Sequence, residues 1–427
     1  MKIKLLLLLL LLRSADCLAL LEIDISEPSL KPLSISIVNL NNPKQNLPII
    51  HVMENNLQNS GVFKLLQNRD SMLDQDNMPR FDLPKEPNLD LLVTVESSMQ
   101  SDLEVKIFLW DMIQKTQLIG KSLSASPEDW RYIAHAISDI IYEASTGAAG
   151  YFGTRIAYVA EIGPQHNRIK RIAMMDQDGH NQIYLTDGSN LVAMPRFSSD
   201  GRGLIYLSYA SHTANPKLRI IDLETEEEKV IEEDIQGKIL SLRGAPKSAR
   251  LLISIFSENA ANIYIMDLAT LERKQVTFEQ SSINSSPSFS PDESKIAFSS
   301  DREDGAQLYI MDVDGTNLYR ISSEHGTYSA PVWSPNGEFI AFSKTHEDDL
   351  YLGIIKPDGS EEQIIAQGNF AEGLAWSPNS RQIIFTQQEK RSRVNLRLYS
   401  IDIVDGIKKT IDTSSDPFSP DWLLSLR

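Results

Sequence analysis

The sequence has a single cysteine, Cys17, and it lies within the first twenty residues. These residues begin with two lysines, continue with eight consecutive leucines and then become small and polar, which predicts a secretory signal peptide over residues 1–19. Cleavage after Ala19 would remove Cys17, so the mature chain would have no disulfide bond to stabilise it. A lipid-attachment signal at Cys17 is the alternative, but Asp16 stands where such a signal has Gly or Ala.

Positive charge and long apolar runs are also scarce. The 427 residues carry 41 Lys and Arg against 58 Asp and Glu, a formal net charge of −17. This acidity argues against binding to nucleic acid, whose phosphates attract Lys and Arg, and against docking on anionic lipid. No apolar run after the leader is long enough to span a bilayer, so we expect no stable membrane insertion. We also expect a monomer.

The motifs of common enzymes and metal sites are missing as well. There is no Gly-x-Ser-x-Gly nucleophile motif. Asp-x-Asp-Gly occurs at Asp176 and Asp312, but the later carboxylates of a calcium loop do not follow, so hairpin turns are expected there. None of the seven histidines lies at metal-ligand spacing from another His or Cys, and His135 is expected to face a neighbouring domain. We therefore predict no metal, no cofactor and no catalytic residue.

What the sequence does contain is a repeated segment. SPSFSPDES at Ser286 has five relatives, of which the copy at Leu242 is worn and the copy at Asp416 is truncated. The equivalent turn positions recur every 42 to 47 residues and are Ser199, Pro246, Pro291, Pro335, Pro378 and Pro420. A near-constant period of this size indicates a repeat architecture.

Each copy predicts a four-stranded antiparallel meander. A run ending in an aromatic residue meets a Ser-Pro-Asp or Ser-Pro-Asn turn, and three runs rich in β-branched and aromatic residues follow. One meander cannot bury both of its faces, so the copies should stack as propeller blades. The first strand begins at Arg155 and the last copy ends after one strand, so the C-terminus should close a six-bladed all-β ring over residues 154–427.

The residues before the ring do not repeat and predict a small α/β domain over residues 34–147. Its sequence contains a helix from Pro48, three antiparallel strands within residues 89–125, and a second helix with one apolar stripe. Ser126 is the predicted N-cap of that second helix, and Gly147 lies just past its end. Residues 20–33 precede this domain as a separate strand segment.

Four segments carry a resemblance to a known family. They are WRYIAHAISDIIYEASTG at Trp130, TRIAYVAEI at Thr154, MDQDGHNQIYLTDGS at Met175 and DPFSPDW at Asp416. Together they resemble the TolB family, the periplasmic component of the Tol-Pal system of Gram-negative bacteria. The likeness covers nearly the whole mature chain, and it implies a periplasmic protein with a six-bladed propeller behind an α/β domain.

The resemblance also implies a function. It implies a scaffold that binds the peptidoglycan-associated lipoprotein Pal through the propeller and TolA through the N-terminal strand, with other outer-membrane proteins as further candidates, and that maintains outer-membrane integrity and constriction during cell division. The TolA contacts would be Leu21, Glu22, Ile23, Asp24 and Ile25. Pro28 and Pro32 remove amide donors, which suits a segment that switches between docked and free states, although a permanently docked edge strand is the alternative.

Pal would bind on one face of the ring. The loops that enter each first strand and those between second and third strands share this face, and the candidate residues are Lys238, Ser285, Ser286, Asp301, Arg302, Tyr328, His346 and Phe370. Aromatic and Arg positions are favoured because such residues tend to carry interface energy. Each candidate could instead be a solvated loop residue.

A propeller enzyme is the alternative from a different functional class. A hydrolase or lyase acting on a small ligand at the channel mouth would need several carboxylates or histidines converging on the channel. The expected channel-facing strands offer mostly Ser, Ala and aromatic residues. We therefore favour the scaffold over the enzyme.

Overall fold

The structure is a computed structural model. It describes residues 31–41, 48–66, 72–74, 76–81, 89–164, 168–210, 216–232, 235–303, 305–323, 325–347, 349–368, 373–388 and 396–424. Residues from Pro32 onward form one compact unit. The predicted leader, residues Leu21 to Ile25 and Phe370 lie outside the described residues.

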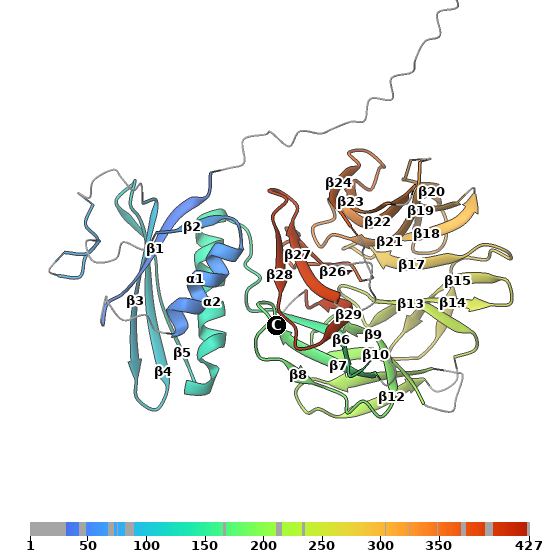
Figure 1. Ribbon diagram of the computed structural model, residues 1–427, viewed down its shortest axis with the longest axis horizontal. Coiled ribbons are helices and arrows are strands. Elements are labelled where there is room, and N and C mark those ends of the chain that lie inside the picture. Colours follow the sequence, from blue (N-terminus) through green and yellow to red (C-terminus); the bar gives the residue numbers. More distant parts are fainter. Residues whose placement is uncertain are drawn as a thin grey trace, which may run out of the picture. The chain divides into compact units, whose positions relative to one another are not determined.

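The first domain is a five-stranded sheet with two helices packed against one face (Figure 1). The sheet has the order β2-β1-β3-β4-β5, in which β1 runs parallel to both neighbours and β3, β4 and β5 form an antiparallel meander. The strands are β1 (Leu33–Asn39), β2 (Phe63–Leu65), β3 (Leu91–Met99), β4 (Leu103–Asp111) and β5 (Thr116–Ala125), and the helices are α1 (Pro48–Asn59) and α2 (Trp130–Thr146).

The start of α2 differs from the prediction. A 3-10 turn, η1 (Pro127–Asp129), comes first, and Ser126 makes no side-chain capping bond. The backbone carbonyl of Ser126 instead accepts the N–H of Asp129 at 2.9 Å, which tightens the first turn and delays the α-helix to Trp130. The predicted end is confirmed, because Gly147 adopts φ 74° and donates its N–H to the carbonyl of Glu143. No described helix is both long and apolar enough to cross a membrane.

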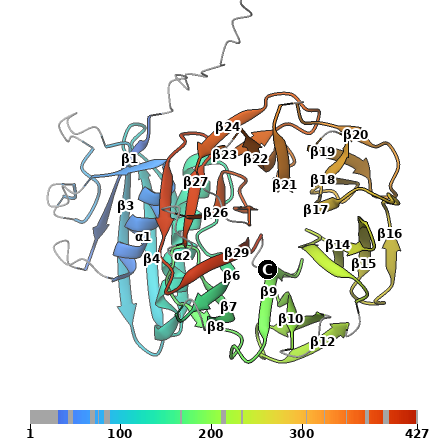
Figure 2. The same cartoon turned by 45° about the vertical axis from the view of Figure 1, so that its right-hand side comes forward.

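The second domain consists of six four-stranded antiparallel sheets. Figure 2 shows these sheets arranged in a ring. The first blade is β29 (Asp416–Trp422), β6 (Arg155–Ile162), β7 (Ile169–Asp176) and β8 (Ile183–Tyr184). The second is β9 (Leu191–Phe197), β10 (Gly203–Tyr209), β11 (Lys217–Asp222) and β12 (Glu228–Glu232), and the third is β13 (Lys238–Gly244), β14 (Arg250–Ser257), β15 (Ala260–Asp267) and β16 (Arg273–Gln275). The fourth is β17 (Asn284–Phe289), β18 (Lys295–Glu303), β19 (Gly305–Asp312) and β20 (Tyr319–Arg320). The fifth is β21 (Thr327–Trp333), β22 (Ile340–His346), β23 (Asp349–Ile355) and β24 (Gln363–Gln367), and the sixth is β25 (Ala375–Trp376), β26 (Gln382–Gln388), β27 (Leu396–Asp402) and β28 (Lys408–Ile411).

The predicted closure of the ring is confirmed. The C-terminal strand β29 is the inner strand of the blade that begins with β6, and it pairs antiparallel from Asp416 opposite Glu161 to Trp422 opposite Ile156. Trp422 is 2% exposed and donates its indole N–H to Thr154 Oγ1 at 2.8 Å. Closure in this way leaves the inner strand of every blade paired with the strand that follows it in its sheet.

The serine and the acidic residue of the repeated Ser-Pro-Asp turn stabilise it by hydrogen bonds. In the fourth blade, Ser290 Oγ donates to Asp292 Oδ1 at 2.6 Å and accepts the N–H of Lys295 at 3.0 Å. The hydroxyl therefore joins both ends of the turn, and burial of the serine protects these bonds. Ser334 with Asn336 and Ser377 with Asn379 repeat this arrangement at 2.7 Å in the next two blades.

The third blade has a divergent copy of this turn, which a residue of the fourth blade stabilises. Glu293 of the fourth blade accepts the N–H groups of Lys247 and Ser248 at 2.7 and 2.9 Å, and it pairs with Arg250 at 2.5 Å. Glu293 is 8% exposed, and its carboxylate replaces the turn chemistry that the third blade lacks. Burial raises the pKa of Glu293, but the bonds from Arg250, Ser248 and the backbone more than offset this, so the pKa lies below its ordinary value.

We expect the Glu293→Gln variant to lose about 1–3 kcal/mol of unfolding free energy at pH 7, because the charged bonds are lost. Since the folded-state pKa is lowered from 4.5, this contribution is complete above pH 4.5 and is lost as the pH falls through the lower folded value. Urea unfolding at pH 7 and pH 3 measures it, with exposed Glu272→Gln as the control. A difference between wild type and Glu293→Gln that stays the same at both pH values would contradict the prediction.

One hydrophobic core joins the α/β domain to the ring. It includes Ile37 and Ile137 from the first domain and Ile156, Ile384 and Trp422 from the first and sixth blades. The short connection after α2 contributes two aromatic side chains to this core, Tyr151 and Phe152. The connection is therefore part of the packed interior.

Candidate protein-interaction site

The ring has two faces that differ in what they contact. We define the entry face by the loops that lead into the inner strands, for example into β13, β17 and β21, and by the β18–β19 and β22–β23 loops. We define the exit face by the Ser-Pro turns and by the turns between third and fourth strands. Antiparallel pairing places each set of loops on one face.

The exit face contacts the α/β domain through the β7–β8 turn. Arg131 of α2 pairs with Asp178 Oδ2 at 2.5 Å and lies 3.6 Å from Asp176 Oδ2. Asn56 Oδ1 of α1 accepts a hydrogen bond from Gln177 Nε2 at 3.2 Å. Both helices are thus bound to the ring.

His135 of α2 lies in the same contact, as a domain-face residue, which is what we expected of it. Asn56 Nδ2 lies 2.9 Å from His135 Nδ1, and His135 Nε2 faces Asp176 at 3.7 Å and Asp178 at 3.9 Å. The side chains of His135, Asp176 and Asp178 lie close enough together to hold a metal ion. The guanidinium of Arg131 already faces both carboxylates, so we describe the group as an ion-pair cluster. Burial raises the pKa of Asp176, but His135, Arg131 and Arg155 lower it below its ordinary value.

We expect Arg131→Gln to weaken this contact between domain and ring. The carboxyl side chains of Asp176 and Asp178 are only 14% and 12% exposed, so removing the guanidinium leaves two poorly solvated negative charges side by side. The expected loss is about 1–3 kcal/mol of unfolding free energy. Urea unfolding measures the loss, with exposed Arg202→Gln as the charge-matched control. Equal stability of the two variants would show that the cluster does not stabilise the contact.

The entry face carries most of the residues predicted to bind Pal. Lys238, Asp301 and His346 are exposed at the ends of β13, β18 and β22. Arg302 is held in place, since its Nη2 donates to Asn284 Oδ1 at 2.8 Å and its guanidinium lies 5.0 Å from the ring centre of Tyr309. Ser286 lines the channel. The structure therefore brings Ser285, Ser286, Asp301 and Arg302 together within the fourth blade.

Tyr328 differs from the other candidates because it is fully buried. Its hydroxyl donates to Glu362 Oε1 at 2.8 Å, Lys344 Nζ lies 4.6 Å from its ring centre, and its ring packs against Phe342. Burial raises its pKa, so the hydroxyl stays protonated at neutral pH. In this structure Tyr328 can support the entry face but cannot contact a partner.

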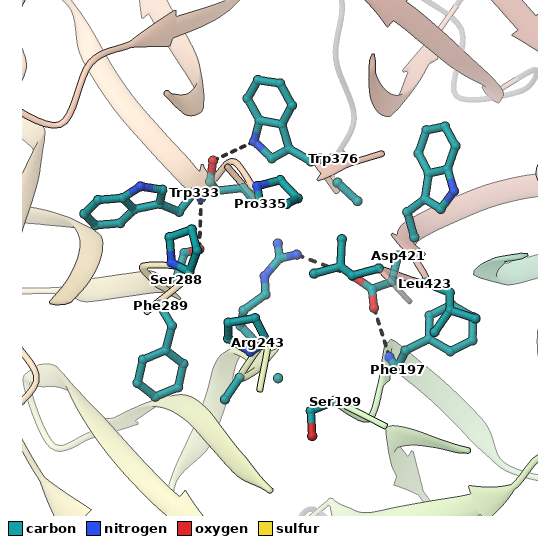
Figure 3. A pocket seen from close by; sticks show the side chains of 18 of the residues that line it. Phe197, Ser199, Arg243, Ser288, Phe289, Trp333, Pro335, Trp376, Asp421 and Leu423 are labelled. Atoms are coloured by element: carbon teal, nitrogen blue, oxygen red, sulfur yellow. Dashed lines mark hydrogen bonds and ion pairs between the residues drawn. The ribbon is translucent and has the colours of Figure 1, made fainter. Parts of the chain in front are cut away.

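The channel contains charged residues that the sequence analysis missed. Arg196, Arg243 and Asp421 occupy the position before the aromatic end of the inner strand, where the other blades have Ser288, Val332 and Ala375. Figure 3 shows Arg243 pointing toward the middle of the ring and contacting Asp421, whose other oxygen accepts the N–H of Phe197 at 2.9 Å. The expectation of mostly Ser, Ala and aromatic side chains in the channel is wrong at these positions. An alignment of the copies would have revealed Arg196 and Arg243 but not Asp421. The equation of Pro420 with the turn proline Pro291 is wrong, because Pro420 lies within β29 and follows the bulge at Ser419 as Pro287 follows the bulge at Ser286.

An enzyme would need a different set of channel residues. Among the described residues that line the two channel cavities, Asp421 is the one carboxylate and there is no histidine. A hydrolase or lyase of the kind considered above requires several such groups to activate water or to abstract a proton. The geometry does not favour that alternative.

Comparisons with known proteins agree with this architecture. A family model described as the TolB amino-terminal domain matches residues 21–118, and one described as the TolB beta propeller domain matches residues 142–423. The Tol-Pal system protein TolB of Paramagnetospirillum magneticum is 38% identical over 214 residues, which are 48% of this chain. The match spans 47% of that relative, about half of its length.

A solved structure gives the same fold. The crystal structure of TolB from Acinetobacter baumannii superposes with a TM-score of 0.80 at 20% identity, covering 92% of this chain and 96% of that one. At this identity the superposition supports the fold alone. The propeller model extends over more than half of the sequence, and the amino-terminal model precedes it in the order that the structure shows. The chain therefore belongs to the TolB family.

Proposed function

We propose that this chain is a periplasmic scaffold of the Tol-Pal system and not an enzyme. In this proposal the propeller binds the lipoprotein Pal, and residues 20–33 bind TolA. The observation that carries the proposal is the combination of a closed six-bladed ring with an amino-terminal domain of the TolB type. Binding of both partners would link the two membranes and support outer-membrane integrity and constriction during division.

In this proposal the entry face is the Pal site, and its accessibility supports the assignment. The α/β domain contacts the exit face of the ring, at Asp178 and Asn379. Lys238, Asp301 and His346 are exposed on the opposite side of the ring. A partner could therefore approach the entry face without displacing the α/β domain.

The remaining assignments belong to the same proposal. Residues 1–19 would be the signal peptide, residues 34–147 the α/β domain and residues 154–427 the propeller. Leu21 to Ile25 would contact TolA, and Pro28 and Pro32 would limit how firmly this segment pairs when it is docked.

The test is calorimetry with the purified mature chain, the soluble domain of Pal from the same organism and the corresponding domain of TolA. We expect deletion of residues 20–33 to abolish TolA binding, and to leave Pal binding unchanged or tighter, because the two sites would be coupled through this segment. A double variant, Ile23→Asp with Ile25→Asp, keeps the chain length and strand β1 and should also lose TolA binding. Undiminished TolA binding by the deleted chain would overturn the TolA assignment, and absence of Pal binding in all three proteins would overturn the Pal assignment.

A further inference from the structure

The channel of the ring contains a chamber of about 380 Å³, within the size range of ligand sites. Residues of all six inner-strand segments line it. Arg196 and Arg243 are the charged side chains among its described lining residues, and no carboxylate is among them. Five serines also line the chamber: Ser241, Ser286, Ser329, Ser343 and Ser419. The chamber is thus a place of positive charge and hydroxyl groups in a chain whose formal net charge is −17.

Backbone carbonyl groups accept the hydrogen bonds of one of the two arginines, Arg196. Met194, Ser286, Ala330 and Ser419 each precede a proline and each adopt φ between 48° and 54°, so the inner strands bulge at these points. The carbonyl groups of Pro195 and Ser419 lie at two of these bulges. Arg196 donates to three carbonyls, those of Leu242 at 2.9 Å, Pro195 at 2.7 Å and Ser419 at 3.4 Å. Arg196 therefore stabilises the backbone of the inner strands that it connects.

Arg243 is held much more loosely. It donates to the carbonyl of Leu374 at 3.3 Å and lies 3.5 Å from Asp421 Oδ1, and both of these distances are long for a hydrogen bond. A guanidinium has five N–H donors in a fixed fork that matches a carboxylate. Arg243 also lines both the chamber and the cavity on the exit side, so it lies between the two. It can therefore offer donors to a ligand in the chamber.

Arg243 shares its counter-charge with another donor. Among the described residues that line the channel cavities, Asp421 is the one carboxylate, and it also accepts the N–H of Phe197. Burial and the nearby charge of Arg196 lower the pKa of Arg243 to about 10, although Asp421 raises it, so the guanidinium remains protonated at pH 7. A charge removed from water is stabilised by a counter-charge with good hydrogen-bond geometry.

We propose that the chamber is a carboxylate-binding site, in which Arg243 pairs with the carboxylate and the serine hydroxyls donate to it. The carboxylate has two chemical sources, a small organic acid in solution or an acidic side chain of a protein docked on the entry face. The second source rests on the function proposed above, and the first does not.

The test is calorimetry of the full mature chain with succinate as the probe, at constant ionic strength set with sodium chloride. Wild type and the Arg202→Gln control should bind equally, whereas Arg243→Gln should bind at least tenfold more weakly. Ser343→Leu fills the chamber and keeps Arg243, so it should also bind more weakly. It serves as the decisive variant if Arg243→Gln does not fold, which circular dichroism will reveal.

A second arm uses the soluble domain of Pal with the same four proteins. Weaker Pal binding by Arg243→Gln and Ser343→Leu, but not by Arg202→Gln, would identify an acidic side chain of the partner as the carboxylate, whether or not succinate binds. Succinate binding with unchanged Pal binding would identify a small acid. If succinate does not bind and the chamber variants bind Pal as wild type does, the carboxylate site is overturned while the scaffold function stands. Failure of Pal to bind wild type would overturn the scaffold function and leave the succinate result to decide the site.

Discussion

A chain that ends at Ser415 should fail to fold cooperatively, because residues 416–427 include the strand that closes the ring. Without β29, strand β6 loses its inner neighbour and becomes an open edge. Trp422 and Leu423 are 2% and 3% exposed, and burial of such side chains contributes about 1.5–3 kcal/mol each. The strand pairing and the bond from Phe197 to Asp421 are lost as well. The combined loss is comparable with the roughly 5–15 kcal/mol by which native proteins are stable.

Circular dichroism during heating, together with binding of a dye that reports exposed apolar surface, measures this effect. The shortened chain should melt without a sharp transition and should bind the dye at room temperature. A chain that lacks only residues 425–427 keeps all of β29 and is the matched control. If the chain ending at Ser415 melted as sharply as this control, closure by β29 would not be what stabilises the ring.

The Tyr151→Ala variant should lose about 3–5 kcal/mol of unfolding free energy, the range for removal of a large buried aromatic side chain. Tyr151 is 2% exposed and packs against Phe152, Tyr142 and Trp422, with ring centres 4.6, 6.2 and 5.9 Å away. Gln382 donates to its hydroxyl at 2.8 Å, and burial raises its pKa well above the ordinary value, so it stays neutral. The cavity would lie where the α/β domain, the connection and the ring meet.

Urea unfolding of Tyr151→Ala and Tyr151→Phe separates the ring from the hydroxyl. Tyr151→Phe keeps the packing and leaves Gln382 without this bond, which should cost about 1–2 kcal/mol. We also expect Tyr151→Ala to separate the unfolding of the two domains, seen as two transitions where wild type has one. Equal losses for the two variants would mean that the aromatic packing at this junction contributes little.

Much of the fold was predictable because its signals are local. The period of 42 to 47 residues, the Ser-Pro turns and the aromatic ends of the inner strands gave the blades. The two incomplete ends of the repeat predicted closure by the C-terminal strand, which the pairing of β29 with β6 confirms. The prediction that Ser126 caps α2 was wrong, because a 3-10 turn and a capped α-helix begin with the same residue types.

The site was predictable only in part. Counting loops placed Lys238, Asp301 and His346 on one face of the ring, since antiparallel topology decides which loops share a face. Burial of Tyr328 was not predictable, because its neighbour Glu362 lies just before β24, 34 positions away in the sequence. Whether these residues bind Pal remains a prediction for the calorimetry described above.

The sequence by itself determined the number of blades, the turns within them, the apolar stripe of α2 and the way the ring closes, because each depends on residues that are neighbours in the chain or recur at a fixed period. Only the tertiary structure decided that Glu293 completes the third blade, that His135 faces Asp176 and Asp178, and that Arg243 meets Asp421 in the channel. These contacts join residues 41 to 178 positions apart. Their partners are chosen by how the blades and the α/β domain pack, and a local sequence pattern does not carry that information.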